Sequence, residues 1–357
     1  MGSTLINKEG ERVFSKKFYL FIVLSILVFL IVGFLVYSSH EVVNPIKKCG
    51  DGTFDESCSL KKPYFCSGGF LIENPIQCGC PDSFKFSKEG CFSEYSIENQ
   101  ERRFNYFLDG EKKEISFNVF PGVVDYLLNL TRIKVYYDGE IPRMDDFKLS
   151  KINDPVQRDY ILSLVSEIEN LASNSKDTQA EIAVSLVQNI PYNESQFKEI
   201  PGFDSKIRLS RYPYQVLYEN QGSCEDKSEL LVLLLKELGF GVTLFDYSEE
   251  NHEAVGIKCP IEKSYLETGY CFVETTMPSP ISFSEGRYLG LSGEGRLMSK
   301  PEIILVSEGI SLSENLEDYA DADSLAKLVD KIENTRKLNY FDKYKMDNLR
   351  DKYQLNF

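Results

Sequence analysis

The chain has 357 residues, a formal net charge of −15 at pH 7 and 42% hydrophobic residues, among them 21 Tyr and 24 Phe. This apolar content is enough for a folded core, so the composition excludes a wholly disordered chain. The acidic balance argues against nucleic acid as a partner, because phosphate contacts require clustered Lys and Arg. The length allows two or three folded units besides a tail and an anchor.

An apolar segment near the N-terminus is the first landmark. Residues 18–37 contain no charged residue and no proline, and a helix of that length crosses the hydrocarbon core of a bilayer. Basic residues precede it, which favours a cytoplasmic tail over 1–17, a single-pass transmembrane helix over 18–39 and an extracytoplasmic remainder. The alternative is a cleaved signal peptide, whose apolar region is normally shorter and ends in small residues.

A cysteine-dense segment follows at 49–91. It holds six of the nine cysteines, interspersed with glycine and proline. Such a segment buries little core, so we expect a disulfide-rich module in an oxidising compartment. Zinc is the alternative, but Cys78-x-Cys80 lacks the usual CxxC spacing and no histidine lies nearby. Fifteen pairings remain open for these residues: Cys49, Cys58, Cys66, Cys78, Cys80 and Cys91.

The spacing of apolar residues predicts the elements in the rest of the chain. Residues 92–150 contain β-rich runs at 115–120 and 133–137, which predict a β-containing spacer. Apolar residues then recur at helical spacing at the start of 151–311, and we expect two packed helices there. The tail over 312–357 is charged and predicts a helix docked on the domain.

The most informative residue is Cys224, which stands just before a strongly apolar helical segment. His252 and then Glu274 follow on strand-like segments, and His252 is the only histidine beyond position 40. This is the chain order of a papain-like thiol catalyst. A thiol has a pKa of roughly 8.5, which a helix N-terminus or an imidazolium lowers. The imidazole then shuttles the proton, and a carboxylate fixes its tautomer and orientation.

Several short motifs in 150–310 resemble the transglutaminase-like superfamily, in its membrane-anchored prokaryotic, archaeal-type form. They are Gly222-x-Cys224-x-Asp226, the Leu-Gly-Phe run at 238–240, His252 before a strand, and the Val-Glu-Thr-Thr run at 273–276. Two departures stand out. Glu274 replaces the usual aspartate, and the chain has no Trp, which the eukaryotic cross-linking enzymes use to stabilise the oxyanion.

The resemblance implies an α+β fold with a helical part and an antiparallel sheet. It also implies that Cys224 attacks a peptide or carboxamide carbonyl to give a thioester, with His252 as acid and base and Glu274 as its partner. Water as acceptor makes a peptidase or amidase, and an amine makes an acyltransferase. No cofactor or metal is implied. The expected partner is a cell-surface protein or peptide, and the oligomeric state is not defined. The alternative is a non-catalytic surface-binding or adhesion protein that retains the fold.

The surroundings of the thiol raise two further points. The backbone N–H of Cys224 is a natural oxyanion donor at a helix start, and Gln215, Gln221 or Tyr192 could supply the second. Acidic residues at 225–226 suit the first turn of a helix but disfavour a thiolate, so a charged histidine would have to outweigh them.

The last two cysteines set a geometric test. If Cys259 pairs with Cys271, the thiol at position 224 is left over. If His252 lies opposite Glu274 in an antiparallel pair, however, Cys259 aligns with residue 267, too far from Cys271 for a disulfide. The bond then requires the 259–270 connection to fold back; otherwise one of the two assignments is wrong.

Overall fold

The computed structural model describes most of the chain, in two units that are treated separately, Met1–Ile46 and Lys47–Phe357. The described residues are 5–6, 12–13, 16–39, 47–88, 90–130, 144–194, 196–199, 206–284, 287–290 and 293–355. Side chains are described over 19–31, 47–88, 90–130, 145–194, 210–284 and 295–355.

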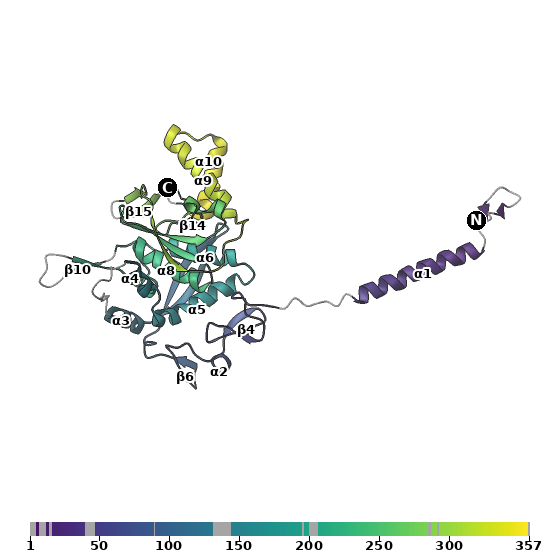
Figure 1. Cartoon of the computed structure of the whole chain (residues 1–357), viewed down its shortest axis with the longest axis horizontal. Helices are drawn as coiled ribbons and strands as arrows, with labels where there is room; N and C mark the ends of the chain where they lie inside the picture. The colour runs from purple at the N-terminus through teal and green to yellow at the C-terminus, as the bar shows by residue number, and fades with distance from the viewer. Residues whose placement is uncertain are drawn as a thin grey trace, which may run out of the picture. The chain divides into compact units, whose positions relative to one another are not determined.

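The N-terminal unit contains the short antiparallel strands β1 (Leu5–Ile6) and β2 (Arg12–Val13) and the helix α1 (Lys16–Ser39). Figure 1 labels α1. The predicted span over 18–39 falls within α1. Among the residues that the structure describes, no helix is both long and apolar enough to cross a membrane. Most of the predicted cytoplasmic tail, 1–17, lies outside the described residues.

The cysteine-rich segment is a small β module. Strands β3 (Ser57–Cys58), β4 (Tyr64–Ser67) and β5 (Phe70–Glu73) form an antiparallel sheet, followed by α2 (Pro75–Cys78) and the hairpin β6 (Lys85–Ser87)–β7 (Gly90–Phe92). Its buried cluster is only Cys49, Tyr64, Cys66 and Leu71. Three disulfides join its cysteines as Cys49–Cys66, Cys58–Cys78 and Cys80–Cys91.

These bonds confirm the predicted disulfides and exclude a zinc site built from the same thiols. Because the module has so small a core, covalent links supply the constraint that packing cannot. The module is also held on the main domain, since Asn170 exchanges two hydrogen bonds with the backbone of Leu71, of 2.8 and 3.0 Å.

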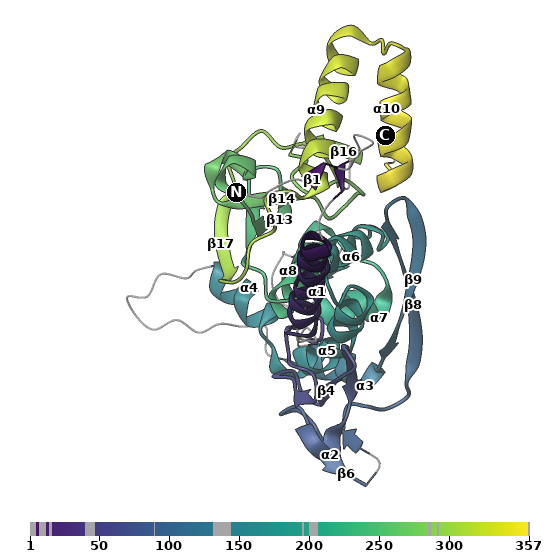
Figure 2. The same cartoon turned by 90° about the vertical axis from the view of Figure 1, so that its right-hand side faces the viewer.

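The spacer contains a long hairpin. Strands β8 (Gln100–Leu108) and β9 (Glu111–Val119) alternate exposed and buried residues, and α3 (Pro121–Asn129) follows. Figure 2 shows the two strands side by side next to α6, which β8 contacts. The second predicted β run, at 133–137, lies outside the described residues.

The main domain sets a buried helix between a helical layer and an antiparallel sheet. The helices are α4 (Met144–Ile152), α5 (Pro155–Leu171), α6 (Lys176–Gln188), α7 (Pro213–Glu219) and α8 (Cys224–Glu237). The sheet has the order β14 (Tyr270–Val273), β13 (His252–Lys258), β12 (Val242–Tyr247), β17 (Glu302–Ser307). Helix α8 packs on β12 and β13 and also contacts α5, α6 and α7.

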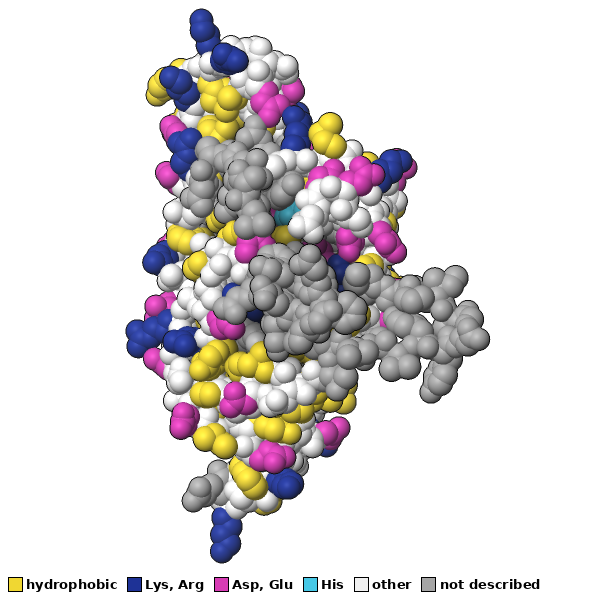
Figure 3. All heavy atoms as spheres, turned by 90° about the vertical axis from the view of Figure 1, so that its left-hand side faces the viewer, with side chains coloured by type: hydrophobic (Ala, Val, Ile, Leu, Met, Phe, Trp, Pro, Cys, Tyr) yellow, Lys and Arg dark blue, Asp and Glu magenta, His cyan; other side chains and the backbone are white. Residues whose placement is uncertain are grey.

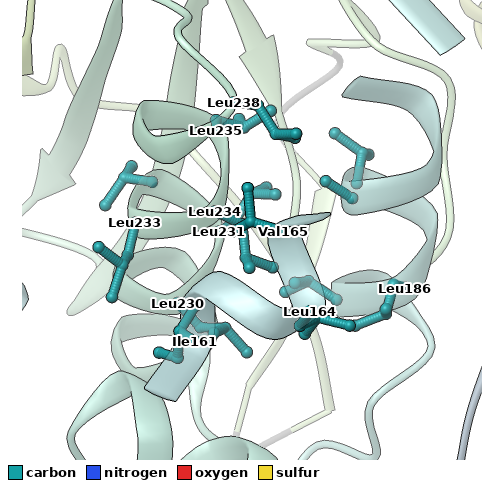
Figure 4. Close-up of a cluster of buried hydrophobic side chains, with 14 of the residues drawn as sticks. Ile161, Leu164, Val165, Leu186, Leu230, Leu231, Leu233, Leu234, Leu235 and Leu238 are labelled. Carbon is teal, nitrogen blue, oxygen red and sulfur yellow. The ribbon is translucent and has the colours of Figure 1, made fainter. Parts of the chain in front are cut away.

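This arrangement confirms the α+β class and explains why residues 230–235 of α8 are all apolar. Figure 4 shows leucines of α8 and its C-cap, buried in one hydrophobic cluster with residues of α5 and α6: Leu230, Leu231, Leu233, Leu234, Leu235 and Leu238 with Ile161, Leu164, Val165 and Leu186. The burial of each such side chain contributes about 1.5–3 kcal/mol. The start of α8, and with it Cys224, is therefore held rigidly.

The chain ends in a helical hairpin, α9 (Glu317–Thr335) and α10 (Tyr340–Tyr353), with its own apolar cluster. Asp318 attaches it to the main domain by accepting the backbone N–H of Ile281 at 2.8 Å. Short elements complete the described fold: β10 (Gln196–Glu199), β11 (Lys206–Leu209), η1 (Ile261–Lys263), η2 (Tyr265–Glu267), β15 (Arg287–Gly290) and β16 (Gly293–Arg296).

Candidate active site

Cys224 occupies the first helical position of α8. Ser223 caps the helix, since its Oγ accepts the backbone N–H of Asp226 at 3.4 Å while the Asp226 carboxylate accepts the N–H of Ser223 at 3.0 Å. This capping box fixes where the helix begins. It places the thiol at the positive end of the helix dipole, which favours a thiolate. Cys224 is 5% exposed and is the one cysteine outside a disulfide.

The acidic residues that follow Cys224 are compensated by cations. Asp226 accepts hydrogen bonds from the backbone N–H and Nη1 of Arg211, at 2.7 and 3.0 Å. Burial raises the pKa of Asp226, but Lys151 and the hydrogen bonds from Ser223 and Arg211 hold it below its usual value. Glu225 lies 4.0 Å from Nζ of Lys151. The two carboxylates therefore oppose a thiolate less than the sequence suggests.

His252 begins β13 and is 3% exposed. Its Nε2 lies 3.0 Å from Oε2 of Glu274, and it lines the same cleft as Cys224. Burial lowers the pKa of His252, but the charge of Glu274, the neighbouring Cys224 side chain and the hydrogen bond with Glu274 outweigh burial and raise the pKa to about 10. Because Nε2 is engaged by the carboxylate, proton exchange with the thiol is assigned to Nδ1.

Glu274 follows directly on β14 and is oriented by the turn after it. Its Oε1 accepts the backbone N–H groups of Thr275 and Thr276, at 3.0 and 2.8 Å, and the Thr276 hydroxyl at 2.6 Å. Burial raises the pKa of Glu274, but His252 and the Thr276 hydrogen bonds lower it below its usual value. The carboxylate is thus held ionised with Oε2 presented to the imidazole, and the longer arm of Glu reaches the ring.

The strand register corrects one expectation. Residues Val255 and Val273 are partners, as are Ile257 and Cys271, so His252 does not lie directly opposite Glu274. The actual register is shifted by two residues from the expected one. The backbone N–H of Cys259 bonds the carbonyl of Gly269 at 3.0 Å, which brings Cys259 within reach of Cys271, and the two form a disulfide with a Cα–Cα distance of 5.7 Å.

With this bond, four disulfides account for eight cysteines and only Cys224 keeps its thiol. The predicted pairing is confirmed, and the assumed register was wrong. The imidazole and the carboxylate meet diagonally across the strand ends, where a long side chain bridges the offset.

The side chains of the three candidates for a second oxyanion donor hydrogen-bond other residues, Gln215 through its amide oxygen. Gln215 accepts the backbone N–H of Tyr212 at 2.9 Å in the cap of α7. Gln221 accepts from Asn193 at 2.7 Å, and the Tyr192 hydroxyl donates to Glu194. None of the three lines the cleft described next.

A cleft of about 330 Å³ opens beside Cys224 and His252. All of its other described lining residues are polar or charged, and four of them are acidic: Lys148, Glu225, Asp246, Ser248, Asn251, Glu253 and Glu302. On the face shown in Figure 3, acidic side chains in magenta lie near histidine in cyan. Sequence reasoning missed Lys148, Asp246, Glu253 and Glu302, although Glu253 directly follows His252 on the strand.

Sequence reasoning also missed a buried lysine behind the site. The Lys227 ammonium donates to the carbonyls of Gln188 and Ile190, at 3.2 and 2.7 Å. Burial lowers the pKa of Lys227 to about 7, against the raising effects of Glu274 and Cys224. The Gln188 amide in turn donates to the Glu274 carbonyl at 2.9 Å. These contacts tie the end of α6 to both the helix start and the turn that presents the carboxylate.

The described residues hold no group of three or more His, Cys, Asp or Glu arranged to bind a metal ion. The site brings together a thiol and an imidazole on one cleft, a carboxylate bonded to the imidazole, and a backbone N–H at a helix start. Such a set can deprotonate the thiol, bind a developing oxyanion and protonate a leaving group.

No protein-family model matches the chain, and no curated protein matches it. Among solved structures, calcium-bound LapG of Legionella pneumophila matches 45% of this chain and 98% of its own, with 13% sequence identity and a TM-score of 0.19. A likeness at that identity and TM-score carries no argument about activity, so the functional conclusion rests on the residues of the site.

Proposed function

We propose that this protein is an extracytoplasmic transglutaminase-like thiol enzyme that acts on peptide or carboxamide bonds. The observation that carries the proposal is the placement of three side chains at one site. Cys224, a buried thiol at a helix start, lines the same cleft as His252 and helps to raise its pKa, and Nε2 of His252 lies 3.0 Å from Oε2 of Glu274. The thiol, the base and its orienting acid thus stand in the order that nucleophilic catalysis by cysteine requires.

In the first half-reaction, Nδ1 of His252 takes the proton of the Cys224 thiol. The sulfur attacks the substrate carbonyl carbon, and the oxyanion accepts the backbone N–H of Cys224. The tetrahedral intermediate then collapses, the carbon–nitrogen bond breaks, and the imidazolium returns its proton to the departing amine. The product is a thioester on Cys224, while Glu274 keeps the imidazole in one tautomer and stabilises its charged form.

In the second half-reaction, His252 deprotonates the acceptor, which attacks the thioester and releases the Cys224 sulfur. The imidazolium then reprotonates the thiolate. Water as acceptor gives a peptidase or amidase, and an amine gives an acyltransferase. The substrate class is a cell-surface protein or peptide, and no cofactor enters these steps.

The proposed location rests on the cysteines and on the sequence of the N-terminal segment. Four disulfides indicate an oxidising, extracytoplasmic compartment, and we propose the uncharged segment 18–37 as the membrane anchor. A reporter fused after Phe357 is then expected outside the cytoplasm, and the protein stays in the membrane fraction after carbonate washing. A soluble form beginning near Ser39 would mean a cleaved signal peptide instead.

Alkylation of the full-length, non-reduced protein tests the catalytic assignment. Because the other eight cysteines are in disulfides, iodoacetamide reports Cys224 alone. Near neutral pH we expect alkylation at least about tenfold faster than in the urea-unfolded, disulfide-intact chain, since an ion pair raises the thiolate fraction. His252→Ala is expected to abolish that advantage, and His40→Ala, at the other histidine of the sequence, is expected to retain it. Equal rates in wild type and His252→Ala would favour the non-catalytic binding protein.

A further inference from the structure

Three carboxylates lie in a row across the sheet beside the proposed nucleophile. Asp246 of β12 is paired with Glu253 of β13 on one side and with Glu302 of β17 on the other. Directly opposite residues of antiparallel strands project from the same face, so the three carboxylates share one face. All three line the cleft that also contains Cys224.

Charge within this row is only partly balanced. The Lys148 ammonium, from α4, bonds Asp246 at 2.5 Å and also Glu253. Lys148 is the one Lys or Arg among the cleft-lining residues that the structure describes, and His252, whose pKa is raised to about 10, already faces the charge of Glu274. Glu225 adds a fourth carboxylate. Like charges directly opposite one another destabilise a sheet. The arrangement therefore costs the fold stability that a bound cation would restore.

Glu253 gives a separate indication of the kind of ligand that the cleft binds. Glu253 is 2% exposed, and its Oε1 accepts no hydrogen bond from any residue that the structure describes. Burial raises the pKa of Glu253 to about 7, although Lys148 acts to lower it. A buried carboxyl oxygen without a donor is costly, and a ligand that carries N–H donors would satisfy it.

We propose that this cleft binds a cationic side chain, lysyl or arginyl, of the peptide whose carbonyl Cys224 attacks. The proposal rests on the proposed function and names the substrate class of the same site. Ammonium and guanidinium groups carry only donors and complement a set of acceptors, whereas an acidic side chain would meet like charge. The cleft volume of about 330 Å³ lies in the range of ligand sites. Of the lining carboxylates, Glu302 is exposed and Glu253 is buried.

The test uses three peptidyl electrophiles of one backbone that differ only in the side chain beside the reacting carbon, which is lysine, norleucine or glutamate. Norleucine has the aliphatic chain of lysine without its charge. The labelling rate of Cys224 in the full-length protein is followed by mass spectrometry. We expect the lysyl probe to label at least about tenfold faster than the norleucyl probe and the glutamyl probe to be slowest. Equal lysyl and norleucyl rates, or faster glutamyl labelling, would overturn the proposal.

Two matched variants locate the effect. Glu302→Gln removes an exposed charge from the row and is expected to lower the lysyl-to-norleucyl ratio about two- to fivefold. Glu308→Gln removes an exposed charge just past the end of the same strand, outside the described lining, and is expected to leave the ratio unchanged. An unchanged ratio in Glu302→Gln, or equal losses in both variants, contradicts the assignment.

Iodoacetamide, run in parallel, separates this proposal from the one on which it rests. If iodoacetamide alkylates Cys224 at the same rate in wild type and His252→Ala, the proposed function is refuted. If His252→Ala slows this alkylation but the lysyl and norleucyl probes label at equal rates, only the proposed cationic subsite is refuted.

Discussion

Glu274→Gln keeps the size of the side chain and removes its charge, which isolates the electrostatic control of His252. In the wild type, Oε2 of Glu274 lies 3.0 Å from Nε2, and the pKa of His252 is raised to about 10. An opposite charge at this range shifts a pKa by about 1–3 units. We therefore expect the pKa of His252 to fall by about 1–3 units in the variant, because burial, which favours the neutral ring, stays unopposed by the carboxylate.

The raised pKa of His252 also determines how the unfolding free energy changes with pH. The folded-state pKa of His252 lies above its reference value of 6.5, so this group adds stability fully below about pH 6.5 and loses the contribution as pH rises through 10. At about 1.4 kcal/mol per unit, the variant loses about 1.4–4 kcal/mol of unfolding free energy at pH 6. The difference between the proteins shrinks above pH 10.

The assay is an NMR titration of the ¹³C-labelled imidazole between pH 5 and 11, with urea unfolding at three pH values. The sequence has two histidines, so a His40→Gln background leaves a single signal. A wild-type midpoint close to 6.5, or identical midpoints in wild type and Glu274→Gln, would refute the reasoning.

Two further predictions concern stability. Lys148→Met leaves Glu253 buried without its cation and is expected to lower the unfolding free energy by about 3–5 kcal/mol, measured by urea denaturation. The double variant Cys259→Ser, Cys271→Ser opens a loop with a sequence separation of 12, and the chain-entropy estimate gives a loss of about 3 kcal/mol in the same assay.

Each of these has its own control. Lys258→Met removes a lysine whose side chain is 41% exposed and whose Nζ lies 3.5 Å from Glu308, and its effect on the unfolding free energy is expected within about 0.5 kcal/mol. A comparable loss in Lys258→Met and Lys148→Met would contradict the desolvated pair. An unchanged urea midpoint in the double cysteine variant would show that hydrogen bonds alone hold the 259–270 connection.

The sequence alone was informative wherever a local signal marks a position. Ser223 followed by Asp226 three residues later is a capping pattern, and the leucines after it require burial on all sides, so a buried helix beginning at Cys224 could be predicted. The cysteine count, with six residues in a coreless segment and one thiol left over, predicted the redox state of every cysteine. These inferences depend on residues adjacent in the chain and on the odd number of cysteines, nine. Neither requires a tertiary structure.

Only the tertiary structure decided which distant residues meet. The shift of β13 against β14 by two residues allowed both the Cys259–Cys271 bond and the diagonal contact of His252 with Glu274. A shift of two residues leaves every side chain on the same face of its strand, so the apolar pattern in the sequence fits both registers equally well. The same pairing brings together a helix residue, Lys148, and acids from three strands. Their separation along the chain gave no local signal, so the acidic cleft exists only once the sheet has formed.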